Sequence, residues 1–247
     1  DVEAQAAISA GATLNGYTLA VKSVETDGYV ARILFSLTAP EDVELEGLNL
    51  GFDRSSFTTA DRQFLSGGEN SSVVPDGDGL ANTVNLLKEF HVAFQDGLRP
   101  YELGSVWELN VTDLYVDRWR ESSRILTEGD WHFSVTFDET NTDYRELELL
   151  SAPTTLKAST GWLADGTDVI EELPVSSFRL RKFSSHVTWD SSSQTAAGDR
   201  LPYADFYVWN GHCACAVLKD GSQIELLGER NEEPIDLEQV DYVLLPE

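Results

Sequence analysis

The sequence predicts an all-β protein made of two tandem antiparallel β-sandwich domains of immunoglobulin-like type, with at most one or two short helices. Apolar and polar residues alternate in several short segments, and this period of two puts successive side chains on opposite faces of a strand. Asp-Gly pairs separate neighbouring segments, which is a hairpin signal because Gly accepts a positive φ. Helical periodicity is scarce, and short strands at this spacing are typical of sandwiches.

The first expected element is a hairpin over residues 16–38. Segments 17–21 and 29–37 are rich in β-branched, aromatic and aliphatic residues, and they flank the pair Asp27-Gly28. Such a pair between two β-rich runs predicts a tight connection between antiparallel strands.

The clearest single strand is expected at residues 131–137. Its apolar face carries Trp131, Phe133, Val135 and Phe137, while His132 belongs to the polar face. This pattern predicts a half-buried antiparallel strand in which His132 is solvated.

Residues 81–94 allow two interpretations. Val84, Leu87 and Phe90 recur every three residues, which is compatible with one short amphipathic helix. A strand over residues 89–94 is equally compatible with the same stretch.

The remaining expected elements are mostly in the second half of the chain. Lys219-Asp220-Gly221-Ser222 predicts a second hairpin. Residues 234–240 resemble a single helical turn that Asp236 caps. The further strands are expected at 106–114, 178–180, 186–189, 205–209, 213–218, 223–227 and 242–245.

A polar loop at residues 138–143 follows the clearest strand and predicts a domain boundary. We therefore expect an N-terminal β-sandwich domain at 1–144 and a C-terminal one at 145–247, each within the usual size range of a domain.

The charge of the chain excludes several functions. Its 247 residues include 43 Asp plus Glu against 17 Lys plus Arg, a formal net charge of -26. Nucleic-acid binding depends on Lys and Arg neutralising phosphates, and anionic membranes repel such a chain. A hydrophobic fraction of 41% is enough for a folded core. No run approaches the roughly 20 apolar residues of a membrane helix, so we expect this fragment not to insert in a membrane itself.

No metal site or cofactor is expected. Cys213 and Cys215 are two residues apart on a predicted strand, too far apart for an easy disulfide, and only His212 is a further zinc ligand nearby. Asp76 and Asp78 superficially resemble the start of a calcium loop. An EF-hand that began at Asp76 would need a Glu at position 12, where Leu87 stands. An ordinary acidic turn is the preferred interpretation, and the role of the two cysteines is left open.

No catalytic residues are expected, and the chain is interpreted as a non-enzyme. The histidines are His91, His132, His186 and His212, and none lies in an HExxH motif. The chain has no GxSxG motif, although a triad formed only in space would leave no sequence pattern. The pairs Glu171-Glu172 and Glu232-Glu233 are predicted in loops.

Two groups of surface residues suggest ligands. Trp119 and Trp162 lie in polar or turn-like contexts and are the better candidates for stacking on a sugar, but a role as filler or interface residues is the preferred interpretation; Trp131 is expected in the core. Arg179 and Arg181 alternate with apolar residues beside Lys182. Pairing of these cations with carboxylates of the same chain is preferred over an acidic partner.

Both ends of the chain resemble a known family. Gly16-Tyr17-Thr18-Leu19, with Ser23-Val24-Glu25-Thr26-Asp27, is similar to the opening of an extracytoplasmic β-sandwich domain of unknown function found in Firmicutes. Leu218-Lys219-Asp220-Gly221-Ser222 and Pro234-Ile235-Asp236-Leu237 resemble the end of its C-terminal companion domain. About a quarter of the chain carries this likeness, and its motifs are structural.

The resemblance implies a location and a role. Family members place these domains outside a single membrane helix, often in anti-sigma-factor-like proteins. We therefore expect a fragment that begins at Asp1 after an absent anchor, located on the extracellular face of the membrane or secreted, that binds an unknown extracellular protein or ligand. The alternative function is a secreted or surface carbohydrate-binding or adhesive module.

Overall fold

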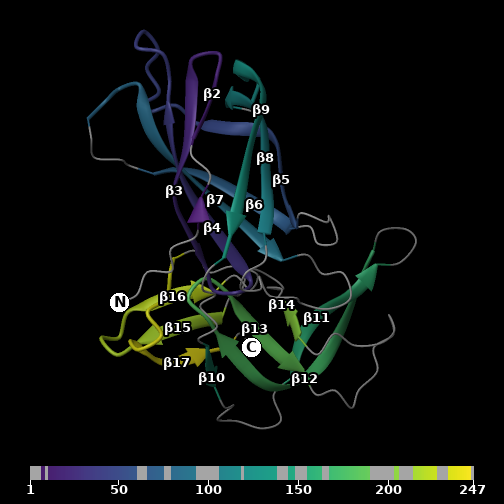
Figure 1. The fold of residues 1–247 in the computed structure, drawn as a ribbon. Helices are drawn as coiled ribbons and strands as arrows, with labels where there is room; N and C mark the ends of the chain where they lie inside the picture. Colours follow the sequence, from purple (N-terminus) through teal and green to yellow (C-terminus); the bar gives the residue numbers. More distant parts are fainter. Residues whose placement is uncertain are drawn as a thin grey trace. The chain divides into compact units, whose positions relative to one another are not determined.

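The computed structural model describes residues 7–8, 11–59, 66–74, 79–92, 106–117, 120–137, 144–147, 155–162, 167–189, 203–205, 214–226 and 233–245. Those up to Phe137 belong to one compact unit and those from Tyr144 onward to a second (Figure 1). All elements among the described residues are strands, and all their pairings are antiparallel. The all-β class predicted from the sequence is thus confirmed for this part of the chain, and none of it forms a helix that could span a membrane.

The described residues of the first unit form two sheets. One has the order β1-β9-β8-β5, with bounds Ala7–Ile8, Arg124–Thr136, Val106–Val116 and Leu50–Thr59. The other has the order β2-β3-β4-β7-β6, with bounds Ala12–Leu14, Tyr17–Thr26, Val30–Thr38, Thr83–Val92 and Ser66–Val74.

Aromatic side chains from both sheets form the core between them. The rings of Phe35 in β4 and Phe133 in β9 are 5.7 Å apart, and Phe57 in β5 lies 5.0 Å from Phe90 in β7. The predicted strand at 131–137 is confirmed, because Trp131, Phe133 and the other apolar positions are buried while His132 is exposed.

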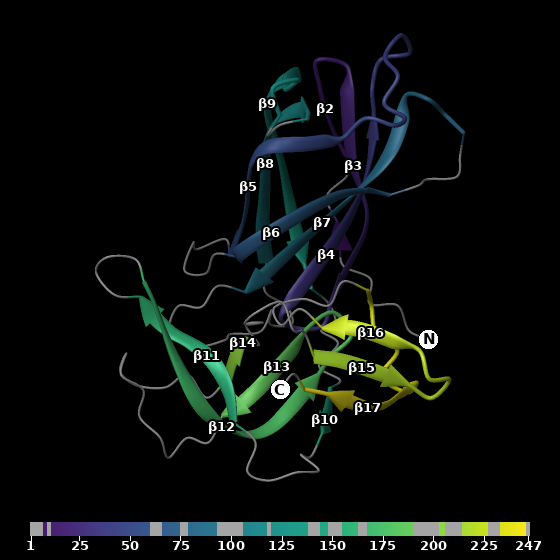
Figure 2. The same ribbon diagram turned by 180° about the vertical axis from the view of Figure 1, so that it is seen from behind.

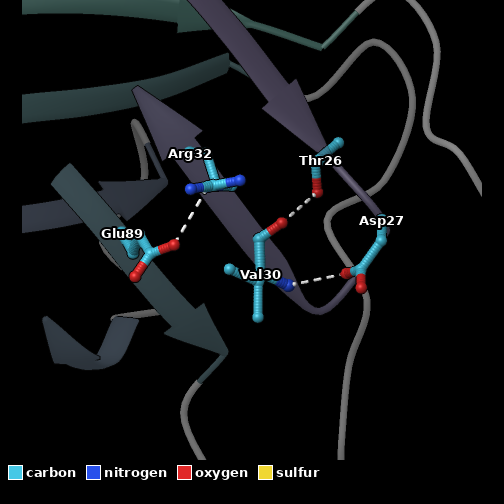
Figure 3. Close-up of polar contacts among 5 residues, drawn as sticks. All are labelled: Thr26, Asp27, Val30, Arg32 and Glu89. Carbon is cyan, nitrogen blue, oxygen red and sulfur yellow. Dashed lines mark hydrogen bonds and ion pairs between the residues drawn. The ribbon is translucent and has the colours of Figure 1, made fainter. Parts of the chain in front are cut away.

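The predicted hairpin at 16–38 is also confirmed. Strands β3 and β4 pair from Thr18 opposite Thr38 to Thr26 opposite Ala31. Asp27 has no exposed surface, and its Oδ1 accepts hydrogen bonds from the backbone N–H groups of Tyr29 and Val30, each at 2.9 Å. Figure 3 shows this carboxylate closing the turn, with the Thr26 hydroxyl donating to the Val30 carbonyl at 2.9 Å.

The helical interpretation of residues 81–94 is wrong. They contain β7, which is hydrogen-bonded to β4 on one side and β6 on the other. Val84 and Phe90 lie on one face of β7 and Leu87 lies on the opposite face, so their three-residue spacing does not mark one face of a helix.

The residues of the second unit that the structure describes also form two sheets (Figure 2). One has the path β10-β12-β13-β14 with β11 paired to β12, and its bounds are Arg145–Leu147, Asp168–Leu180, Ser185–Trp189, Tyr203–Asp205 and Thr155–Trp162. The other has the order β16-β15-β17, with bounds Gln223–Leu226, Ala214–Leu218 and Val240–Leu244.

A hydrophobic cluster joins these two sheets. It includes Phe178 and Leu180 from β12, Ala216 from β15, Leu226 from β16 and Val240 from β17. The predicted hairpin over residues 219–222 is confirmed, with the Leu218 N–H donating to the Ser222 carbonyl at 2.8 Å. Hydrogen bonds from the Ser222 side chain and backbone lower the pKa of the exposed Asp220 carboxyl in this turn.

Two sequence interpretations in the second unit need correction. Glu171 and Glu172 lie in strand β12, where they pair with β11, rather than in a loop. Residues 237–239 form a turn and no helix, although the Asp236 carboxylate does accept the Glu238 N–H at 3.0 Å, as a cap would.

Candidate functional site

Polar side chains cover the face of strands β5, β8 and β9 that lies opposite the aromatic core. We call this surface the outer face. In β8 the buried residues Trp107, Leu109 and Val111 point to the core, so the residues between them point outward. The residues of the outer face form rows across the three strands: Ser56, Asn110 and His132; Thr58, Glu108 and Ser134; and Arg54, Thr112 and Asp130.

His132 is at the centre of a hydrogen-bonded cluster on the outer face. Its Nε2 lies 2.8 Å from Oε2 of Glu108, and its Nδ1 lies 2.5 Å from Oδ1 of Asn110. The Ser134 hydroxyl donates to the same Glu108 oxygen at 2.9 Å. Both ring nitrogens of His132 therefore face oxygen atoms of the cluster.

The hydrogen bonds of this cluster converge on one carboxylate. The Ser134 hydroxyl donates to Glu108, and His132 meets the same carboxylate from the same strand. The side chain of His132 keeps 57% of its surface exposed. The cluster therefore presents ordered donors and acceptors to solvent.

Beyond this cluster, a kink changes which residues of β8 point outward. Asp113 has φ of 43°, and its Oδ1 accepts the Gly129 N–H at 2.7 Å. Past this point Leu114 and Val116 are buried, so the partly exposed Tyr115 lies on the outer face. Its direct cross-strand neighbours are Gly51 in β5 and the exposed Ile125 in β9.

A second polar group lies on the outward side of the other sheet. Arg32 in β4 stands opposite Glu25 in β3 and Glu89 in β7, and its Nε lies 2.9 Å from Oε1 of Glu89 (Figure 3). Only 16% of the Arg32 side chain and 9% of the Glu89 side chain are exposed. This burial and pairing indicate a structural ion pair.

The basic cluster of the second unit pairs within the chain, as predicted for Arg179. Its guanidinium lies 3.8 Å from Oε2 of Glu146 and 5.1 Å from the centre of the Tyr144 ring. Arg181 lies 4.9 Å from the same ring and is buried. Both arginines therefore contact Tyr144, but only Arg179 belongs to β12, which ends at Leu180, so the two do not share one strand face as predicted.

The other predicted candidates are partly buried, buried or outside the described residues. Cys215 is a partly buried residue of β15, and His91 is a buried residue of β7. Cys213, His212, Asp76, Asp78 and Trp119 lie outside the described residues, as do the side chains of Trp162 and His186. Within the described ranges, no three His, Cys, Asp or Glu side chains form a group that could hold a metal ion.

The sequence indicated that His132 lies on a polar strand face but not which residues it contacts. The partners Glu108 and Asn110 come from another strand, and only the register of β8 against β9 brings them together. Glu108 and Asn110 are two residues apart, as are His132 and Ser134, so each pair lies on one face of its strand. This spacing was the one sign of the cluster that the sequence contained.

No family model matches the chain, and no curated protein matches it. A solved structure, the crystal structure of a conserved domain protein from Bacillus anthracis, is a distant structural match with a TM-score of 0.41 and 14% sequence identity. The match covers 72% of this chain and 52% of that protein, so this chain matches about half the length of that protein.

Proposed function

We propose that this chain is the non-catalytic, extracytoplasmic binding or sensory region of a membrane-anchored bacterial protein of the anti-sigma-factor-like kind. In this proposal the two units are tandem immunoglobulin-like β-sandwiches. The aromatic contacts between the two sheets of the first unit and the cluster that joins the two sheets of the second unit support that architecture.

The binding role is supported by the ordered polar side chains of the outer face. Its central side chains are already held by hydrogen bonds among Glu108, Asn110, His132 and Ser134. Preorganised groups lose less conformational entropy when a ligand binds. The resemblance at both ends of the chain supports a position outside the membrane, and a net charge of -26 favours partners other than polyanions.

The experiment that tests this proposal is a topology measurement on the full-length native protein. The gene is sequenced upstream of Asp1, and intact spheroplasts are treated with protease. A preceding apolar helix, with cleavage of this region from outside, is the expected result. A cleavable signal peptide, with the protein found in the medium, would contradict the anchored sensor and favour a secreted binding module. Protection of this region from protease would contradict both functions.

A further inference from the structure

We infer that the outer face binds a neutral polysaccharide, along the line from His132 to Tyr115. This inference rests on the proposed binding role and names its ligand class. It requires an extracellular position but holds for an anchored or a secreted protein.

The hydrogen-bonding groups of the outer face match the chemistry of sugar hydroxyls. A sugar hydroxyl both donates and accepts, so it suits a surface that offers both functions at fixed positions. Asn110 offers its amide and Glu108 its carboxylate, and His132, whose two ring nitrogens face these two groups, holds both in place. The hydroxyls of Ser56 and Thr58 extend the same rows across β5.

An aromatic ring lies further along the same face. Tyr115 stands opposite Gly51, where a Cβ atom would meet nothing within 4 Å. The missing side chain leaves room beside the phenol ring, and a tyrosine presents an apolar body and a polar tip to a ligand. Asn110 and Tyr115 are five residues apart in β8, which corresponds to roughly 17 Å along a strand. A chain of several sugar units could span this distance.

The charges on this face favour a neutral ligand. Arg54 lies 3.4 Å from Asp53, so this cation already has a carboxylate beside it, and Glu108 already accepts a hydrogen bond from Ser134. Asp130 is the further carboxylate in these rows. The overall charge of -26 opposes an anionic glycan. The same net charge would attract a cationic protein to any part of the molecule, so it gives no reason for such a partner to bind at the outer face.

The test is affinity electrophoresis of the purified chain in native gels that contain mixed-linkage β-glucan, dextran or xylan. The acidic chain migrates readily, so retardation measures binding. We expect at least one of these polysaccharides to retard it. The double variant Asn110→Ala/His132→Ala should weaken that binding at least about tenfold, the equivalent of one or two lost hydrogen bonds. Tyr115→Ala should weaken it as well.

The matched control is Ser72→Ala, an exposed position of β6 in the other sheet of the first unit. It should bind as the unchanged chain does. Thermal unfolding of each variant shows whether it is folded, and His132→Gln provides a second, milder change. Absence of retardation in all three gels would overturn the inference, as would retardation that the outer-face variants retain or that Ser72→Ala also loses. The topology measurement does not depend on the gel results, so failure of the binding inference is distinguishable from failure of the anchored-sensor proposal.

Discussion

Asp27 shows how one buried carboxylate determines a turn. It has no exposed surface and accepts two backbone N–H groups of the β3–β4 connection. Asp27→Ala would remove the carboxylate oxygen that accepts both hydrogen bonds, so we expect it to lower the free energy of unfolding by about 2 to 4 kcal/mol. Urea unfolding measures this change. Asp27→Asn keeps an acceptor oxygen and should cost less; equal losses in the two variants would contradict the explanation.

Lys88 shows why sequence patterns misled the interpretation of β7. It lies on the core-facing side of the strand, with its Nζ 5.3 Å from the centre of the Phe52 ring and 2.8 Å from the Ser71 hydroxyl. An aromatic ring can stabilise a cation, so Lys88 occupies a core-facing position where the hydrophobic pattern predicts an apolar residue. Lys88 points inward and Leu87 points outward, so the alternation of apolar and polar residues is inverted at these two positions. The apolar residues of the sequence then recur about every three positions, as in a helix, instead of every two.

At the scale of elements, the approach of β2 to β9 depends on a glycine. Gly129 has φ of 127°, and a Cβ there would lie 2.5 Å from Cδ2 of Leu14. We therefore expect Gly129→Ala to destabilise the first unit by about 1 to 3 kcal/mol, through backbone strain and this clash. Gly51→Ala is the matched control, because its Cβ would meet nothing within 4 Å and no positive φ is involved. Thermal unfolding compares them, and similar behaviour of both variants would contradict this account.

Elements with regular alternation and clear turns could be predicted from the sequence, as the hairpin at 16–38 and the strand at 131–137 show. Strand β12 could not be predicted at its full length. It contains Pro174, which cannot donate a ladder hydrogen bond and so argues against a strand. In the structure β12 pairs with β11 up to Pro174 and with β13 from Val175 onward, so the proline lies where the partner strand changes. The His132 cluster could not be predicted either, because it depends on the register of β8 against β9, which the alternation of apolar and polar residues does not specify.

At the scale of the whole molecule, the two compact units predict separate unfolding. Phe133 is buried in the core of the first unit and Phe178 in that of the second. Replacing a buried Phe by Ala typically costs about 3 to 5 kcal/mol. We expect calorimetry to resolve two transitions, with Phe133→Ala lowering one and Phe178→Ala lowering the other. If both variants lowered a single transition equally, the chain would unfold as one cooperative unit.

The net charge of -26 predicts that salt stabilises the folded chain. Like charges are closer together in the folded state than in the unfolded chain, so their repulsion opposes folding. Raising the ionic strength from about 0.01 M to about 0.15 M shortens the Debye length from about 30 Å to about 8 Å and screens that repulsion. The Tm measured by differential scanning calorimetry should therefore rise with NaCl. Choline chloride should raise it equally, because screening depends on ionic strength and not on the identity of the cation. A Tm that stayed constant or fell would mean that favourable ion pairs, such as Arg32 with Glu89, outweigh the general repulsion.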